Sequence, residues 1–174
     1  MDLTAHSRRG FLGLTAAGTV CALYPWPAHA LDAPTGTVIL TITGRIAHPN
    51  AGGAAEFDLA MLRKLPQHSF STKTPWYPQP RKFSGVPLHE LMAAVGAQGS
   101  TVRAVALNDY RVDIPTEDLA RHGALLAYLL DDRPMPVREK GPLVIIYPFD
   151  DRPELRTALL YSRAIWQLRS LELR

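Results

Sequence analysis

Residues 140–151 read KGPLVIIYPFDD, and this stretch decides the fold. Its apolar run, residues 143–147, is rich in β-branched side chains and lies between two prolines, which predicts a buried central strand. Pro148 directs the chain out of the sheet, and such strand ends can form the wall of a ligand site. The residues expected in that wall are Tyr147, Phe149, Asp150, Asp151 and Arg152. The alternative is an ordinary strand followed by a charged surface turn.

The composition fits one packed domain. The chain has 174 residues, 47% of them hydrophobic, and a net charge of +3. This length corresponds to a single domain, and the apolar share is ample for a core. So small a net charge, with no basic run interleaved with aromatic residues, argues against nucleic acid as a partner.

The N-terminal residues predict an export signal. Paired arginines in SRRGFL, residues 7–12, precede a mild apolar run over residues 13–23, and AHA at residues 28–30 is a small-x-small cleavage site. The paired arginines resemble the twin-arginine (Tat) signal, which exports folded proteins. We therefore expect residues 1–30 to be a Tat-type signal peptide. Residues 31–174 are then a periplasmic domain with no membrane insertion after cleavage.

The cysteine content limits the chemistry of that domain. Cys21 is the only cysteine and lies inside the predicted signal, so the mature chain would have no disulfide, thiolate nucleophile or cysteine metal ligand. Lipid attachment at Cys21 is disfavoured because Val20 is bulky for a lipoprotein cleavage site. A membrane anchor is disfavoured because the apolar run is shorter than the roughly 20 residues that a spanning helix needs.

Periodicity and turn residues predict short strands with short helices inserted between them. The predicted strands are residues 38–46, 55–58, 67–74, 102–107, 110–114, 125–130, 143–147 and 161–173, and the predicted helices are residues 59–65, 88–95, 115–121 and 153–160. Residues 75–83 predict a proline-rich loop that presents Trp76 and Tyr77. Because regular βαβ alternation is missing, the pattern indicates an α+β or mainly β fold in a single domain.

The common catalytic motifs are missing from the sequence. A nucleophile elbow, a glycine-rich phosphate loop and a zinc pattern each need a spacing that does not occur, and the histidines after residue 30 are far apart. We therefore predict no catalytic residue and no metal ligand. Aromatic, Asp and Arg residues instead gather at strand ends and loops. Such a set suits a flat heterocycle that stacks on a ring and forms hydrogen bonds at its edge.

Several short motifs follow one another in a specific order. They are GVPL at 85–88, LNDY at 107–110, LAY at 126–128, RPM at 133–135, KGPL at 140–143 and WQL at 166–168. In this order they resemble the molybdopterin-binding domain of the sulfite oxidase family, over the chain from about residue 38 to its end. The resemblance implies a sulfite oxidase-like α+β fold, with mixed, mainly β sheets and short helices, and a cleft that holds a pterin.

One departure from that family concerns its metal. In sulfite oxidase-like enzymes a cysteine thiolate holds the molybdenum, whereas SFSTKT, residues 69–74, occupies the corresponding region here. Neutral hydroxyls are poor substitutes for a soft thiolate. The sequence is more similar to the PruR-type pterin-binding regulators. That resemblance implies a small periplasmic protein that binds a reduced pterin without metal and signals to the periplasmic domain of a membrane protein that makes and degrades cyclic di-GMP.

The resemblance thus implies a metal-free, tetrahydropterin-like ligand and a role in signalling rather than catalysis. One alternative stays open, a molybdopterin-dependent oxidoreductase or a subunit of one, because the Tat-type signal suits such enzymes. Molybdopterin would then be the cofactor. A further alternative is an unliganded adaptor that uses the same cleft for a peptide.

The predicted ligand-binding residues are Trp76, Asn108, Asp109, Tyr110, Arg138, Lys140, Tyr147, Phe149, Asp150, Tyr161, Arg163 and Trp166. We expect Trp76 to stack on the pterin and one of Asp109 and Asp150 to accept hydrogen bonds from its amino and ring N–H groups. One of the three predicted cationic side chains, those of Arg138, Lys140 and Arg163, would bind the oxygen atoms of the pterin. Alternatives remain, since Trp166 suits a core position, Asp109 suits a hairpin turn, and Asp150 suits a solvated turn.

Overall fold

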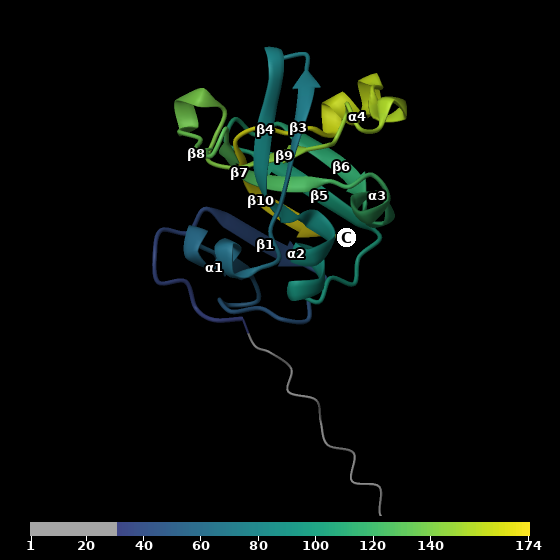
Figure 1. Cartoon of the computed structure of the whole chain (residues 1–174). Coiled ribbons are helices and arrows are strands. Elements are labelled where there is room, and N and C mark those ends of the chain that lie inside the picture. Colours follow the sequence, from purple (N-terminus) through teal and green to yellow (C-terminus); the bar gives the residue numbers. More distant parts are fainter. Residues whose placement is uncertain (1–30) are drawn as a thin grey trace, which may run out of the picture.

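Two β-sheets share one hydrophobic core in the computed structural model, which describes residues 31–174 (Figure 1). The first sheet consists, in spatial order, of β2 (Ala55–Phe57), β1 (Leu40–Gly44), β10 (Leu168–Leu173), β5 (Thr101–Ala106) and β6 (Arg111–Pro115). Its strands β1 and β10 are parallel, and the other pairs are antiparallel. The predicted export signal, residues 1–30, lies outside the described residues.

The second sheet is antiparallel throughout. It consists of β3 (His68–Thr74), β4 (Tyr77–Pro87), β7 (Leu125–Leu130) and β8 (Arg133–Pro134), with β9 (Val144–Ile146) also paired to β7. Gly85 lies where the register between β4 and β7 shifts. A Cβ atom at this position would collide with the carbonyl oxygen of Leu126, so glycine allows the two strands to approach.

Short helices connect the strands. They are α1 (Leu59–Lys64), α2 (Leu88–Ala94), α3 (Thr116–Arg121), α4 (Ala158–Arg163) and the 3₁₀ turns η1 (Val137–Glu139) and η2 (Pro153–Leu155). None of the helices within residues 31–174 is long and apolar enough to cross a bilayer. Short helices inserted among strands of two sheets confirm the predicted α+β class.

Asp58 shows how a local sequence signal fixes one of these helices. Its carboxylate accepts a hydrogen bond from the backbone N–H of Met61 at 2.8 Å, which caps the N-terminus of α1. It also accepts from the backbone N–H groups of Thr35 and Gly36, at 2.9 and 2.7 Å. The bond from Met61 is the largest of the effects that hold the pKa of Asp58 below its usual value. One side chain thus fastens the start of the described chain to the core.

Three sequence predictions need correction. Residues 143–147 are buried as predicted, but the strand is shorter, since β9 spans only Val144–Ile146. It pairs with β7 on one side, and Val144 forms an isolated bridge with Trp166 on the other. Residues 75–83, predicted as a loop, contribute most of their length to β4. The closing strand begins at Leu168, because Tyr161 belongs to α4.

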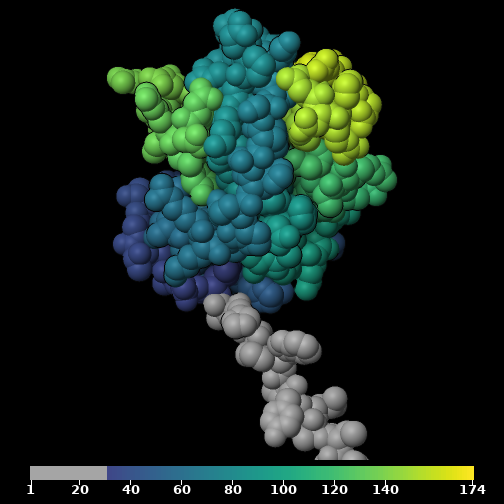
Figure 2. Space-filling view, viewed as in Figure 1, coloured from purple at the N-terminus to yellow at the C-terminus, as the bar shows by residue number. Residues whose placement is uncertain are grey.

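The β3–β4 hairpin extends beyond the sheet in which it takes part (Figure 1). Strand β7 covers β4 only from Phe83 to Pro87, so the part of β4 nearer its turn has β3 as its one partner. On the face shown in Figure 2, the hairpin stands between the segment around β8 and η1 and the segment around α4. Each of these two neighbours encloses a recess with the hairpin.

Candidate functional site

The first recess, which we call the aromatic recess, lies between the hairpin turn and α4 and has a volume of about 240 Å³. It is lined by Trp76, Ala106, Asn108, Tyr110, Tyr161, Ser162, Ala164, Ile165, Trp166 and Gln167. Five of these were predicted to bind ligand: Trp76, Asn108, Tyr110, Tyr161 and Trp166. They come from the hairpin turn, the β5–β6 turn, α4 and the segment before β10, which only the tertiary fold brings together.

Three aromatic rings form a wall of this recess. The ring of Trp76 meets that of Trp166 edge to face at a centroid distance of 5.1 Å, and that of Tyr161 at 6.2 Å. Behind them, the buried ring of Phe149 packs against Tyr161 at 4.7 Å. Edge-to-face pairs at these separations are attractive and restrict ring rotation. The wall is therefore held in shape by packing within the protein.

The polar groups of the aromatic recess are neutral. Asn108 Oδ1 accepts from the backbone N–H of Tyr110, and the Tyr110 hydroxyl donates to the carbonyl of Ser162. Gln167 Nε2 donates to the carbonyl of Val137 at 2.8 Å. Among the described residues, Asn108 Nδ2 and Gln167 Oε1 form no hydrogen bond, and no charged side chain lines the recess. One amide donor and one amide acceptor thus stay available to a ligand.

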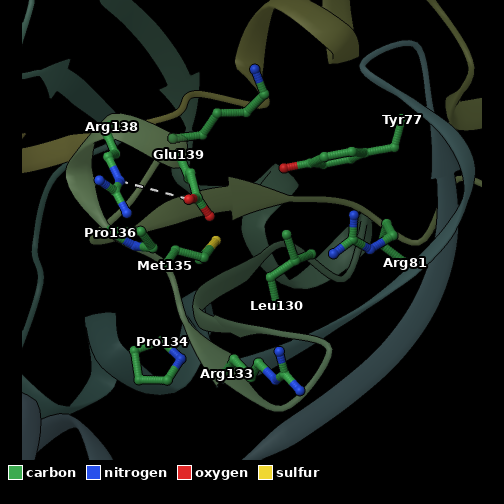
Figure 3. Close-up of a pocket in the computed structure, with 10 residues that line it drawn as sticks. Tyr77, Arg81, Leu130, Arg133, Pro134, Met135, Pro136, Arg138 and Glu139 are labelled. Atoms are coloured by element: carbon green, nitrogen blue, oxygen red, sulfur yellow. Dashed lines mark ion pairs between the residues drawn. The ribbon is translucent and has the colours of Figure 1, made fainter.

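The second recess, which we call the basic recess, lies on the other side of the hairpin and measures about 460 Å³ (Figure 3). It is lined by Tyr77, Arg81, Leu130, Arg133, Pro134, Met135, Pro136, Arg138, Glu139 and Lys140. Two predicted ligand-binding residues, Arg138 and Lys140, lie here rather than in the aromatic recess. The guanidinium of Arg81 lies over the ring of Tyr77, 4.8 Å from its centroid. Burial raises the pKa of Tyr77, and the charge of Arg81 partly opposes this.

Trp166 and Lys140 separate the two recesses. Lys140 Nζ lies 5.5 Å from the centroid of the Trp166 ring, and Tyr77 packs on the same ring at 5.9 Å. The indole Nε1 of Trp166 is buried and has no hydrogen-bond partner among the described residues. Trp166 is partly buried and lies before β10, so the strand position expected for it is wrong, but it serves both as packing and as recess wall.

The segment expected to form a wall of the site does not line either recess. Tyr147 and Phe149 have no exposed surface and belong to the core, where their rings pack together and Phe149 packs against Tyr161 of α4. Asp150 pairs with Arg156 at 2.5 Å and accepts from the backbone N–H of Lys73 at 2.8 Å. This segment therefore supports the aromatic wall from behind, and its predicted role as a direct wall is corrected.

Neither aspartate expected at the pterin edge faces a recess. Asp109 occupies the β5–β6 turn with a positive φ of 62° and pairs with Arg169 at 2.7 Å, outside the aromatic recess. The side chain of Arg163 is also directed elsewhere, since it pairs with Asp118 at 2.8 Å in a position where both side chains are 11% exposed. Arg163 thereby fastens α4 to α3 and positions the neighbouring Tyr161 and Ser162.

Several lining residues were not among the predicted ligand-binding residues. Gln167 carried a signal, because it belongs to the WQL motif. Arg133 carried a signal of the same kind, because it belongs to the RPM motif. Arg81 carried none, since its meeting with Arg133 depends on the pairing of β4 with β7 and of β7 with β8. Tyr77 was expected to be presented by a loop and is instead on β4.

The residues near the hairpin end suit a pterin better than a protein-bound molybdenum ion. Residues 31–174 contain no cysteine, and no three His, Asp or Glu side chains among them gather as metal ligands. Thr72 Oγ1 is engaged, since it accepts from the backbone N–H of Asp150 at 3.1 Å. Thr74 Oγ1 is buried without a partner, but a neutral hydroxyl is a weak ligand for this metal. The aromatic and amide groups, in contrast, match a flat heterocycle with donors and acceptors on its edge.

Comparison with known proteins gives two findings. The family model described as "oxidoreductase molybdopterin binding domain" matches residues 34–149, about two thirds of the chain. Thirty chains of solved structures match, among them the sulfane dehydrogenase SoxCD from Paracoccus pantotrophus. That likeness has a TM-score of 0.57 and 17% sequence identity, and it covers 77% of this chain but only 37% of the other. No curated protein matches.

The two findings have different scope. At 17% identity, the similarity to the sulfane dehydrogenase shows a shared fold and nothing of its reaction. The family match includes Trp76, Asn108, Tyr110 and Lys140 but ends before Tyr161, so part of the aromatic recess lies beyond it.

Proposed function

The chain belongs to the oxidoreductase molybdopterin-binding domain family and has its sulfite oxidase-like fold, and we propose that it binds a reduced pterin without a metal ion. The observation that carries this proposal is the aromatic recess itself. Its wall of Trp76, Tyr161 and Trp166 offers a surface for a flat ring, and its amides offer a donor and an acceptor for the ring edge. With no thiolate within residues 31–174, recognition would rest on non-covalent contacts.

The ligand ring would enter against Trp76 with its polar edge toward Asn108 and Gln167. Asn108 Nδ2 would donate to a ring nitrogen or carbonyl, and Gln167 Oε1 would accept from an amino or N–H group. Because the recess has no charged lining side chain, it favours an uncharged ring. This arrangement replaces the aspartate contact expected from the sequence.

We further propose that the protein is a periplasmic sensor which reports the pterin to the periplasmic domain of a cyclic di-GMP-metabolising membrane protein. The paired-arginine signal and the resemblance to PruR-type regulators support this role. Tyr110 is 45% exposed and lies on the rim of the aromatic recess, where its hydroxyl also contacts α4. A partner that binds over this rim would contact both the ligand and the element that holds it.

The competing proposal is a molybdopterin-dependent oxidoreductase or a subunit of one. The family description and the fold shared with a sulfane dehydrogenase favour it. The chain spans 37% of that dehydrogenase chain, so further parts would have to supply the rest of such an enzyme. The two proposals differ in one measurable property, which is stoichiometric molybdenum in the native protein.

Pterin binding is tested by anaerobic titration of the exported protein with tetrahydrobiopterin, with calorimetry as the readout. Trp76→Ala removes one ring of the recess wall, and loss of ring stacking is worth about 1–3 kcal/mol, or about 5- to 150-fold in affinity. Leu159→Ala is the matched control, because Leu159 lies on α4 but is 58% exposed and lines neither recess.

Asp109→Ala provides a second comparison. Its carboxylate faces Arg169, so this variant is expected to bind the pterin as the unmodified protein does. Unchanged affinity in Trp76→Ala, or a loss in Asp109→Ala as large as that in Trp76→Ala, would overturn the assignment of the aromatic recess.

A further inference from the structure

A small buried polar cluster holds α4 against α3. Asp118 lies on α3 and Arg163 on α4, and their side chains form an ion pair at 2.8 Å in which both are 11% exposed. His122 follows the last turn of α3, and its side chain is 18% exposed. Its Nε2 lies 3.9 Å from Asp118 Oδ1, the carboxylate oxygen that does not accept from Arg163. A single carboxylate therefore faces both the arginine and the histidine.

Positive charges outnumber negative ones around the ring of His122. The titratable and charged side chains of the cluster are Asp118 and Arg121 from α3, Arg163 from α4, Tyr147 from the end of β9, and Arg152 and Glu154 at the start of η2. The carboxylate of Glu154 is already engaged by Arg152 at 2.9 Å. Within residues 31–174, Asp118 is thus the one carboxylate in contact with the imidazole.

The neutral ring fits this environment better than the charged one. Burial is the largest of the effects that lower the pKa of His122, and three arginines add to it, whereas Asp118 opposes it. His122 Nδ1 is buried and has no hydrogen-bond partner among the described residues. In a protonated ring this nitrogen would be an N–H donor without an acceptor, which is costly for a buried group. While α4 is held in place, the ring should therefore stay neutral until the pH falls below the ordinary histidine value of about 6.5.

Protonation of His122 would act on the contact that fixes α4. An imidazolium attracts Asp118 and repels Arg163, so it competes with the arginine for the one carboxylate. Arg163 Nε already lacks a partner in the described part of the chain, so a weaker ion pair would leave the buried guanidinium with little compensation. A helix of six residues has little stability of its own and depends on such tertiary contacts. We therefore expect α4 to loosen when the ring takes up a proton.

Helix α4 carries part of the aromatic recess. Tyr161 and Ser162 directly precede Arg163, and both line the recess. The ring of Tyr161 meets that of Trp76, and the carbonyl of Ser162 accepts from the Tyr110 hydroxyl at 3.0 Å. Movement of α4 would thus displace one ring of the wall and disturb the rim.

We propose that His122 is a proton-sensitive switch: uptake of a proton by its ring draws Asp118 away from Arg163, loosens α4 and lowers the affinity of the aromatic recess for its ligand. Ligand binding requires a fixed α4 and protonation loosens it, so by linkage the affinity falls as the pH decreases. The ligand part of this inference rests on the proposed pterin function, whereas the loosening of α4 does not.

The first measurement needs no ligand and follows hydrogen exchange at the backbone amides of the exported protein. Protection factors of α4 are compared with those of α1 at about pH 7.5 and about pH 5.5, on the two sides of the ordinary histidine value. We expect α4 to lose about threefold or more of its protection relative to α1 at the lower pH.

Matched variants assign this loss to one side chain. His122→Gln and His122→Leu both lack the titrating ring, so neither should lose protection of α4 at the lower pH. His89→Gln is the control, because His89 lies on α2, is 47% exposed and lines neither recess. This control should show the same loss as the unmodified protein. Equal protection of α4 relative to α1 at both pH values, or the same loss in both His122 variants, would overturn the switch.

The second measurement is anaerobic calorimetry with tetrahydrobiopterin at the same two pH values. Titration of the pterin itself affects the unmodified protein and His122→Gln alike, so the ratio of their affinities isolates the contribution of His122. We expect the unmodified protein to bind about threefold or more weakly than His122→Gln at the lower pH. An affinity ratio that does not change with pH would overturn control of the site by His122. No binding at either pH, with α4 loosened by acid, would overturn the proposed pterin function and leave the switch standing.

Discussion

Replacing Asp118 by alanine leaves the guanidinium of Arg163 buried without its carboxylate. In the folded protein Arg163 Nη1 donates to Asp118 Oδ2 at 2.8 Å, and both side chains are 11% exposed. Arg163 Nε is buried and already lacks a partner, as does the hydroxyl of Tyr147 in the same cluster. Water therefore cannot readily replace the lost carboxylate, and the variant must either keep an unpaired charge or open the contact between α3 and α4.

The expected cost follows from this burial. Removing one partner of a buried ion pair typically destabilises a protein by about 3–5 kcal/mol. For a domain of this size each kcal/mol lowers the melting temperature by roughly 2–4 °C, so a decrease of about 10 °C is expected. Urea unfolding, monitored by tryptophan fluorescence, measures the change in the free energy of unfolding, because Trp76 and Trp166 lie beside α4.

Asp113→Ala is the matched control. Asp113 also forms an ion pair with arginine, accepting two hydrogen bonds of 2.8 Å from Arg103, but its side chain is 48% exposed. Solvent can replace such a pair, so the control should lose far less stability. If Asp118→Ala is no less stable than Asp113→Ala, burial of the Arg163–Asp118 pair does not determine its contribution to stability. Asp118→Ala should also weaken pterin binding, because α4 carries Tyr161 into the aromatic recess.

Two further predictions concern pH. Burial lowers the pKa of His122, and the charge of Asp118 partly opposes this shift. As the pH decreases below about 6.5, the unfolded state therefore takes up a proton before the folded state does, and stability should fall. His122→Leu should flatten the dependence of melting temperature on pH between about 7 and 5, and an unchanged slope would contradict this. Hydrogen bonds, of which that from Met61 has the largest effect, lower the pKa of Asp58. The contribution of the Asp58 carboxylate to stability is therefore complete above about pH 3.9 and is lost as the pH falls toward its folded-state pKa. Asp58→Asn should remove this loss of stability at acid pH in the same melting measurements, and an unchanged pH profile at acid pH would count against it.

Much of the fold could be predicted because its local signals agree with its packing. In β5 buried and half-buried residues alternate, and the apolar run over residues 102–107 predicted a strand here. The part of β4 that was missed contains Pro78 and Pro80. These prolines are tolerated because this part of β4 pairs with β3 on one side only, so its other edge needs no backbone N–H donor. Sequence periodicity contains no information on which strand edges stay unpaired.

The site was predicted less completely, because residue type does not determine direction. Trp76, Tyr110 and Tyr161 were singled out as aromatic residues at element ends, and the fold brings them to one recess. Asp109 had the chemistry expected of a pterin contact, but its left-handed turn conformation directs it to Arg169. Phe149 had the same signal as Tyr161, yet it lies behind Tyr161 in the core. Such choices depend on long-range packing that a single sequence does not encode locally.

Metal-free pterin binding by this member of a molybdopterin-binding family is the property that separates the proposed sensor from the oxidoreductase. It is tested most directly on protein purified from the periplasm under anaerobic conditions, by elemental analysis for molybdenum together with mass spectrometry of the extracted ligand. We expect a reduced pterin and no stoichiometric molybdenum. Stoichiometric molybdenum extracted together with molybdopterin would contradict it and favour the oxidoreductase.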